Sequence, residues 1–428
     1  MIFIMSNSNR RGSAAILLTI AFAGMLVLVT CLFAAARVAA GVSYADAAFQ
    51  AAGRSVLSEY DTELLKRYGL FAFKGDERRI ERDIAFYADA SLRKDKKAYF
   101  PFAPSGSRTR VFDIETDKTE ANLKEFSLLD VDVFEQQLKE AAAAKTAERL
   151  TGGRNKSGKM DYSDPLSGHK NRTLRNEGVT ASLPSADVTW SFPDVSSLSP
   201  ENLSNLADKA ASDVLNSQYI MAAFGHANDG VSDDDSFFDA EIEYLLSGKM
   251  KDLANYDSVK AKLTLIRFFA NNIAISRDPL KRAQITALAA PFAAAAGIGE
   301  LAASIAITEI WVGAETKNDI GLFEAGEKVA FIKTSAQWAL TDCAKTVYGL
   351  FDGRLIRPIS KSGQTYEDYL RALIFLMDRE TKLLRVMDLI QIDMKAHYNR
   401  EFLVREYYTG YRFKVVALGE TFEYTEKY

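Results

Sequence analysis

The residues best placed to do chemistry are the carboxylates between residues 229 and 243. This run contains Asp229, Asp233, Asp234, Asp235, Asp239, Glu241 and Glu243. Clustered carboxylate oxygens can hold calcium, but this run lacks the alternating ligands, the central Gly and the distant Glu of an EF-hand loop. We therefore expect a solvated loop that caps a helix starting near Phe238. The alternative is a calcium site formed by Asp233, Asp235 and Asp239.

Other reactive side chains are few, and their spacing matches no familiar site. Two cysteines, Cys31 and Cys343, and three histidines leave too few soft ligands for a Cys/His zinc site. The patterns Gly-x-Ser-x-Gly and His-Glu-x-x-His do not occur, so the sequence shows no catalytic motif of a serine hydrolase or a metallo-hydrolase. The stretch 153–160 resembles a phosphate-binding loop but has Met160 where a hydroxyl must reach magnesium. We predict no enzymatic activity and no cofactor.

The elements that carry these residues begin with an apolar run near the N-terminus. Ser13 to Ala36 is 24 residues without a charge, which as a helix reaches about 36 Å against a hydrocarbon core of about 30 Å. Arg10 and Arg11 favour a cytoplasmic N-terminus, with the bulk of the chain extracytoplasmic. We predict a single-pass protein of the cell membrane. The alternative is a cleaved secretory signal, because small residues at 34–40 offer cleavage sites.

Length and charge limit the number of folding units and the kinds of partner that the chain can have. With 428 residues, 48% of them hydrophobic, it is long enough for more than one folding unit and can bury a core. The first 40 residues hold Arg10, Arg11 and Arg37 and no acid, which leaves 50 basic groups against 57 acidic ones elsewhere. This balance gives no reason to expect nucleic acid as a partner.

Directly after the apolar run, small and apolar residues step by three and four. They are Val42, Ala45, Phe49, Ala52 and Val56. This is the spacing of a helix that packs along one seam, so we predict one nearly continuous helix from about residue 13 to about residue 66. We interpret the seam as a surface that packs against a partner. The alternative is a plain anchor followed by a core helix of the ectodomain.

The remaining periodicity predicts short strands and many helices. Strands are expected at 68–73, 108–114, 121–129, 401–408, 411–418 and 421–428, with a turn at 409–410 and Gly419 before the last strand. Helices are expected at 76–92, 131–150, 200–224, 238–247, 255–275, 278–295, 298–313, 364–377 and 380–397. Thr365 with Asp368 forms a capping-box pattern. The Ala-rich segment 278–313 is broken by Pro291 and Gly297, which favours a buried helical hairpin over a second span.

We therefore predict an α+β, mainly helical fold. A single N-terminal transmembrane helix continues into a long helix, and an ectodomain of helices with a small antiparallel sheet follows. That sheet should join the C-terminal hairpin to strands from residues 68–129, which would make the two halves one unit. The expected parts are a cytoplasmic tail (1–12), the transmembrane helix (13–36), its extramembrane continuation (37–66), a mixed helix and strand part (67–150), a flexible loop or linker (151–200), and a helical part with the C-terminal hairpin (201–428).

Several stretches resemble the TadE/TadG-like proteins of Flp (Tad) pilus assembly, in the Gram-positive type with a large ectodomain of unknown function. They are Arg11-Gly12, Ala36-Arg37, and the segments 55–61, 67–71, 241–249, 366–370 and 384–392. The resemblance covers about the first 75 residues and most of 240–428. It makes Gly12 a candidate processing site. However, the TadE kind has Glu five residues after this Gly, where this chain has Leu17, so the likeness is to the anchored TadG kind.

The resemblance implies a non-enzymatic, membrane-anchored extracytoplasmic component of a Flp/Tad-type pilus assembly or secretion apparatus. Its partners would be membrane lipid and other Tad pilus or pseudopilin components, with homo- or hetero-oligomers formed through the N-terminal helix. The alternative is a membrane-tethered extracellular enzyme or receptor acting on cell-wall polymer, because pairs of catalytic acids leave no spacing signature in a sequence.

Overall fold

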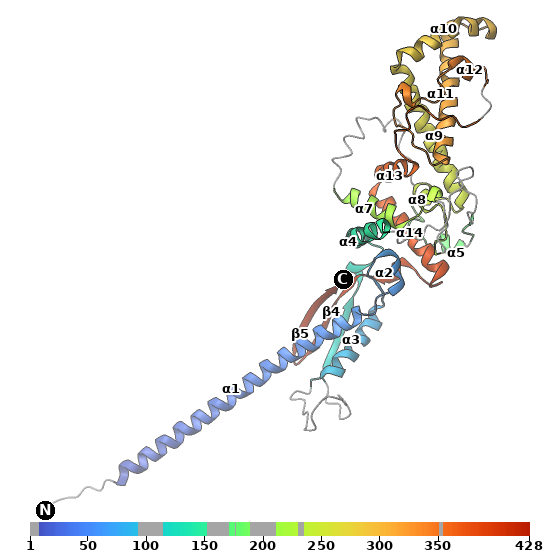
Figure 1. Ribbon diagram of the computed structural model, residues 1–428. Helices are drawn as coiled ribbons and strands as arrows, with labels where there is room; N and C mark the ends of the chain where they lie inside the picture. The colour runs from blue at the N-terminus through green and yellow to red at the C-terminus, as the bar shows by residue number, and fades with distance from the viewer. Residues whose placement is uncertain are drawn as a thin grey trace, which may run out of the picture. The chain divides into compact units, whose positions relative to one another are not determined.

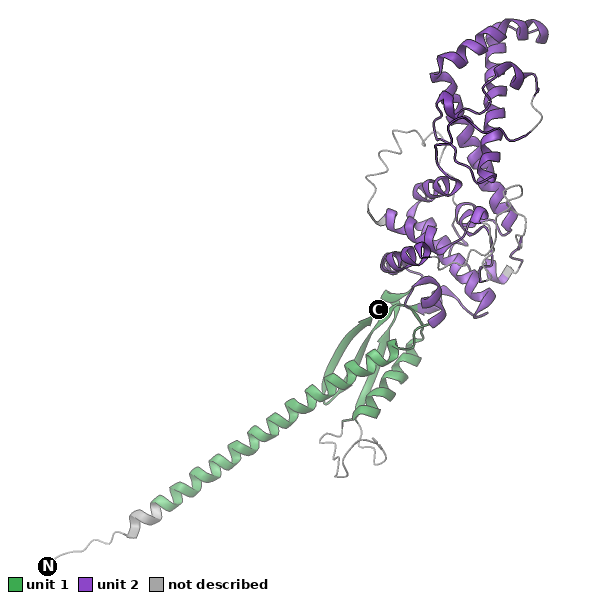
Figure 2. Ribbon diagram, viewed as in Figure 1, with its two compact units in different colours: residues 1–61, 72–127, 408–428 green, residues 62–71, 128–407 purple. Residues whose placement is uncertain are grey.

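A computed structural model gives the fold of the chain (Figure 1). It describes residues 8–92, 114–151, 171–175, 177–188, 211–229, 235–350 and 354–428. The contacts divide the chain into two compact units (Figure 2). Unit 1 contains residues 1–61, 72–127 and 408–428, and unit 2 contains residues 62–71 and 128–407.

Unit 1 is one long helix and one short helix on a three-stranded antiparallel sheet. The long helix is α1 (Ser8–Leu57) and the short one is α3 (Glu77–Leu92). The sheet has the order β2 (Thr116–Asn122), β4 (Gly410–Ala417), β5 (Glu420–Lys427). The short strands β1 (Phe73–Lys74) and β3 (Tyr407–Tyr408) pair with each other, and a 3-10 turn, η1 (Lys124–Phe126), follows β2.

The side chains of β4 alternate between the core and the solvent, as expected for a sheet with one covered face. Tyr411, Phe413, Val415 and Ala417 are buried, together with side chains of α1 and α3. On the other face, Lys414 is paired with Glu423 of β5 at 2.5 Å. The two helices therefore cover one face of this sheet.

Residues from early and late in the chain share this sheet, because β2 pairs with β4. This confirms the predicted joining of the C-terminal hairpin to the earlier strands. The prediction that the sheet makes the two halves one unit is wrong, because the contacts divide the chain into two compact units. The predicted turn at 409–410 is wrong, whereas the predicted break at Gly419 is correct, since β4 and β5 are joined at Leu418 and Gly419, which have positive φ angles of 56° and 77°. Such angles suit a two-residue hairpin turn. The predicted turn residue Gly410 lies inside β4, where a Cβ would be 2.5 Å from the Glu426 carbonyl oxygen.

The predicted strands 411–418 and 421–428 match β4 and β5 within one residue, whereas the remaining predicted strands differ from the structure. Residues 68–73 contain the end of a helix and only the start of β1, and residues 401–408 contain a 3-10 turn and β3. Of the predicted strand 108–114, residues 108–113 lie outside the described residues. The long helix ends at Leu57, not near residue 66, and a separate helix, α2 (Thr62–Tyr68), belongs to unit 2.

Within its described residues, unit 2 is mainly helical, with irregular segments between the helices. Besides α2, its α-helices are α4 (Val131–Leu150), α5 (Glu177–Thr180), α7 (Ala211–Ala223), α8 (Glu241–Ser247), α9 (Asp252–Arg277), α10 (Pro279–Ala296), α11 (Glu300–Glu324), α12 (Cys343–Val347), α13 (Tyr366–Leu376) and α14 (Arg379–His397). Its 3-10 turns are η4 (Ala227–Asp229), η5 (Ser335–Gln337) and η6 (Val404–Glu406). The expected caps are present: Asp130 accepts from two amides at the start of α4, and Thr365 and Asp368 form a capping box on α13.

Helix α14 is the central element of unit 2, since every residue from Thr381 to Met394 is buried. Its carboxylates fix neighbouring segments. Asp388 accepts hydrogen bonds from the Ser185 amide at 3.0 Å and from its hydroxyl. Ser185 lies in the stretch predicted to be a flexible loop, and the described residues 177–188 instead include α5 and this contact with α14.

A buried ion network holds the irregular segment 329–342 against α9 and α11. Arg267 donates to Asp319 at 3.0 Å, and Lys333 contacts both Asp319 and Glu315. Glu315 also accepts from the amides of residues 339 and 340, each at 2.9 Å. Two cations thus balance two carboxylates in the core, which removes the cost of an uncompensated buried charge.

The Ala-rich helices α10 and α11 form a bent pair and not an antiparallel hairpin. They meet at an angle of 108°. Their inner faces are buried around Trp311, as the prediction of a buried hairpin requires, but Leu301 is 78% exposed and Ile305 57% exposed. The prediction is therefore only partly correct.

Candidate functional site

The first candidate site is the apolar part of α1. Among the described residues, α1 is the one single helix that is long and apolar enough to cross a membrane, while α10 and α11 meet that test only as a bent pair. Every side chain from Ala14 to Ala40 is exposed, including Leu17 at 72% and Phe33 at 72%. A core helix would have these side chains covered by the fold. The segment is consistent with a membrane anchor or a signal sequence.

The seam that follows is occupied by the chain itself. Ala45 and Phe49 are completely buried, and Ala52 and Val56 are 2% exposed, all within the core of unit 1. The Phe49 ring meets that of Phe422 at 5.2 Å between centroids. Only Val42 is partly exposed. The interpretation of the seam as a partner-packing surface is therefore wrong, and the alternative of a core helix is correct for these residues.

Close packing explains why small residues recur along this part of α1. A Cβ on Gly53 would lie 2.7 Å from the Cε1 atom of Phe413, so the ring of β4 needs a glycine opposite it. The Tyr411 hydroxyl donates to the Gly53 carbonyl at 2.6 Å. The small side chains thus let α1 approach its own sheet and not a second chain.

The candidate processing residue Gly12 lies within α1, three residues after Asn9 and near the helix start. A peptidase needs an extended backbone in its active site, so cleavage there requires the first turns of α1 to unwind. No contact of the described residues bears on whether this bond is cut.

The acidic residues between 229 and 243 have different environments and different contacts. Asp233 lies outside the described residues. Asp235 is within 3.6 Å of Arg67, and Asp239 is buried, with its amide donating to Asp252 at 2.9 Å. Within the described ranges, no group of three His, Cys, Asp or Glu side chains is arranged to hold a metal ion.

The buried glutamates of α8 hold the connection that leads into that helix. Glu241 accepts from the Gly225 amide at 2.7 Å, and Glu243 accepts from the Ala227 amide at 3.0 Å. Glu243 also accepts from the Tyr366 hydroxyl at 2.7 Å. Burial raises the pKa of Glu243 from 4.5 to about 7, which these hydrogen bonds only partly offset. This carboxyl changes its charge near neutral pH.

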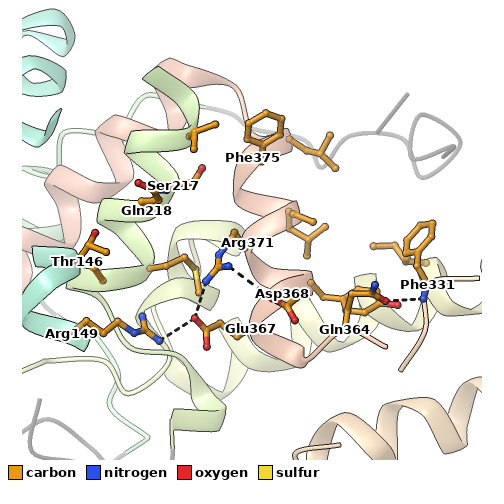
Figure 3. A pocket seen from close by; sticks show the side chains of 18 of the residues that line it. Thr146, Arg149, Ser217, Gln218, Phe331, Gln364, Glu367, Asp368, Arg371 and Phe375 are labelled. Carbon is orange, nitrogen blue, oxygen red and sulfur yellow. Dashed lines mark hydrogen bonds and ion pairs between the residues drawn. The ribbon is translucent and has the colours of Figure 1, made fainter. Parts of the chain in front are cut away.

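The second candidate site is a groove in unit 2 between α4, α7 and α13, with a volume of about 1100 Å³ (Figure 3). Most of its wall is apolar and comes from Leu150, Val214, Met221, Ile266, Phe331, Leu373, Phe375 and Leu376. The three helices are far apart in the sequence: α7 and α13 supply most of the apolar wall, and α4 supplies Thr146, Arg149 and Leu150. The volume is slightly above the usual range for small-molecule sites, about 300–1,000 Å³.

Charged side chains gather at one part of this groove. Glu367 accepts from Arg149 of α4 and from Arg371 of α13, each at 3.1 Å. Figure 3 shows Glu367 between the two guanidinium groups, with Phe375 on the far side of the groove. Asp368, the other acid of the wall, lies 3.9 Å from Arg371 and belongs to the capping box of α13. The groove therefore has an apolar part and a charged part.

No sequence pattern predicts this groove. The apolar side chains Leu370, Leu373 and Ile374 of α13 are all buried, and no sequence pattern gives a role to Arg149 or Arg371. An unusually wide apolar stripe on α13 was the available signal. The partner helices could not be identified, because nothing in the sequence shows that α4 and α7 lie beside α13.

Comparison with protein families gives a match over more than half of the chain. A model of a family of unknown function, DUF5702, matches residues 166–418. That range includes β4 and the groove residues of α7 and α13, and it excludes α1. Comparisons with curated proteins and with solved structures give no match.

Proposed function

The chain belongs to the family of unknown function DUF5702, and we propose that it is a non-enzymatic, membrane-anchored extracytoplasmic component of a Flp/Tad-type pilus assembly or secretion apparatus. One observation carries the proposal: α1 is a single helix whose first part is apolar on every side and exposed, while its last part is built into a folded unit.

The exposed apolar surface of α1 requires an apolar environment that shields it from water. As a helix, residues 14–40 are about 40 Å long, and their side chains are exposed all along this length. Soluble monomers rarely expose contiguous apolar patches above a few hundred Å². No charge occurs between Ser13 and Ala36, so lipid is a suitable cover. A helix with all its backbone groups bonded internally is also the form that a single span must take.

The buried end of α1 gives the anchor a mechanical role. Helix α1 shows no break between the apolar segment and Leu57, and Phe49 and Val56 fix it in the core of unit 1. A force or displacement applied to the membrane segment would reach unit 1 through a continuous helix. This is the property that a component of an assembly machine in the membrane needs.

Because the seam is occupied, contacts with partner helices are assigned to the part of α1 in lipid. Gly24 lies there, and a Cβ added to it would meet no other atom within 4 Å. In lipid, where hydrophobic burial between helices contributes little, small residues favour association because they let backbones approach closely. Neighbouring pilin-like helices would pack at this position.

Affinity purification from the native membrane tests this proposal. Gly24→Leu should reduce co-purification of pilus-assembly proteins while the chain stays in the membrane. The matched control is Val29→Leu, which changes a side chain in the same segment without filling a glycine position. Wild-type preparations that contain no pilus-assembly protein, or equal yields from both variants, would contradict the proposal.

A further inference from the structure

We propose that the groove between α4, α7 and α13 binds a single-chain amphiphile with an anionic head group, either a carboxylate or a phosphate. The acyl chain lies along the apolar wall, and the head group lies at Arg149 and Arg371. This site is in unit 2 and does not depend on the function proposed for α1.

The walls favour an acyl chain over an extended peptide. They are formed largely by three α-helices, whose backbone groups are bonded within each helix. An extended peptide would find few backbone partners there and would bury its own polar groups at a cost. An acyl chain has no such groups, and side chains such as Met221, Leu373 and Phe375 can pack along it.

The charged part of the groove favours an anionic head group. Two guanidinium groups share Glu367, and Arg371 is 51% exposed on its side chain, so donor atoms remain beyond those bonded to the glutamate. The Nη1 atom of Arg149 has no hydrogen-bond partner among the described residues. Guanidinium groups bind carboxylate and phosphate oxygens through paired N–H donors.

The same wall also contains a buried hydroxyl group that makes no hydrogen bond among the described residues. Ser217 lines the groove from α7, is 4% exposed, and its hydroxyl has no partner among the residues that the structure describes. Native proteins seldom leave a buried polar group unbonded. Both unpartnered atoms, Arg149 Nη1 and Ser217 Oγ, are buried, so a bound amphiphile whose polar end lies at this wall would supply acceptor oxygens to them after rotation of the two side chains.

Fluorescence titration with a dansyl-labelled undecanoic acid tests the site. The full chain is reconstituted in phosphatidylcholine nanodiscs, and nanodiscs without protein give the background partitioning of the probe. We expect saturable binding of one probe per chain above this background. Hexadecanoic acid and hexadecyl phosphate should displace the probe, and their relative potency distinguishes a free fatty acid from a phosphate-headed lipid as the source. Hexadecanol should be about tenfold weaker than either.

Two variants and two matched controls locate the binding. Arg371→Gln removes one charged donor and should weaken binding about tenfold, whereas Arg357→Gln should not, although Arg357 has a similar exposure of 53% and is also paired with a glutamate. Ala372→Trp fills the groove and should abolish saturable binding, whereas Ala254→Trp, at a partly exposed helix position away from the groove, should not.

Several results would overturn the proposal. Binding no greater than in empty nanodiscs would exclude the site, and so would equal binding by Arg371→Gln and Arg357→Gln. Equal displacement by hexadecanol would exclude the anionic head group. Thermal unfolding of each variant is measured alongside, and Arg371→Gln keeps the test decisive if Ala372→Trp fails to fold.

Discussion

Truncation of Phe49 tests whether the end of α1 is a core element or a surface. The side chain is completely buried in unit 1, beside Phe422 and among residues of α3 and β4. Phe49→Ala removes the ring and leaves a cavity, because the sheet and α3 can close around it only in part. We expect a large loss of stability that is confined to unit 1.

The magnitude separates the two interpretations. Truncation of a buried Phe to Ala costs about 3–5 kcal/mol, and the aromatic pair with Phe422 is included in that loss. Domains of ordinary stability have about 5–15 kcal/mol in total. Had Phe49 been a surface residue awaiting a partner, its truncation would change the free energy of unfolding by no more than about 0.5 kcal/mol.

Hydrogen exchange of the full chain in nanodiscs, read by mass spectrometry, measures this effect by region. Peptides from β4 (Gly410–Ala417) should lose protection in Phe49→Ala, whereas peptides from α14 should not. The matched control is Phe33→Ala in the same helix, because Phe33 is 72% exposed and outside the core. Unchanged protection of β4 in Phe49→Ala would refute the assignment of this residue to the core.

Two further substitutions test the packing and the electrostatics. Gly53→Ala should lower the free energy of unfolding by about 1 kcal/mol, because the new Cβ would lie 2.7 Å from a Phe413 ring atom. Without such a contact, the same change in a helix interior usually raises the free energy of unfolding by a similar amount. A urea titration in which Gly53→Ala stabilises unit 1 would speak against the close contact. Glu243→Gln tests how the free energy of unfolding depends on pH. The folded chain binds the Glu243 proton more tightly than the unfolded chain, since burial raises its pKa from 4.5 to about 7, so the wild-type free energy of unfolding should fall by up to about 3 kcal/mol as the pH rises through that window. The variant should lose this part of the pH dependence and the exposed control Glu309→Gln should keep it; identical pH profiles for all three proteins would show that the carboxyl is not buried as described.

The sequence predicts the helices of this protein well because each carries local signals. The α13 capping box at Thr365 and Asp368, the cap of α4 at Asp130 and the uncharged run in α1 are all legible from neighbouring residues. The long helix α14 is also predicted, although it is buried on every side from Thr381 to Met394. These elements need no knowledge of their partners.

Features that depend on distant contacts are predicted less well. The three-and-four spacing around Phe49 correctly indicates a packed helix face, but spacing cannot show whether a partner or the chain's own sheet covers that face. The predicted hairpin is misplaced because Gly410 is a turn former in general, whereas here the close approach of Glu426 requires a glycine within the strand. Leu418, which adopts a positive φ, carries no turn signal.

The groove shows the same limit for the candidate site. Arg149 and Arg371 lie more than two hundred residues apart, and only the packing of α4, α7 and α13 brings them to one carboxylate. The acidic run draws attention by its density, yet the structure uses Glu241 and Glu243 to hold a backbone connection.

The most direct test of the central claim is the N-terminus of the chain as it exists in the native membrane. Membranes are washed with alkaline carbonate, and the retained protein is purified and its intact mass and N-terminal sequence are determined. An uncleaved apolar helix predicts that the chain remains in the pellet and begins at or before Ser13. A chain that begins after residues 34–40 and appears in the wash would contradict an anchored α1.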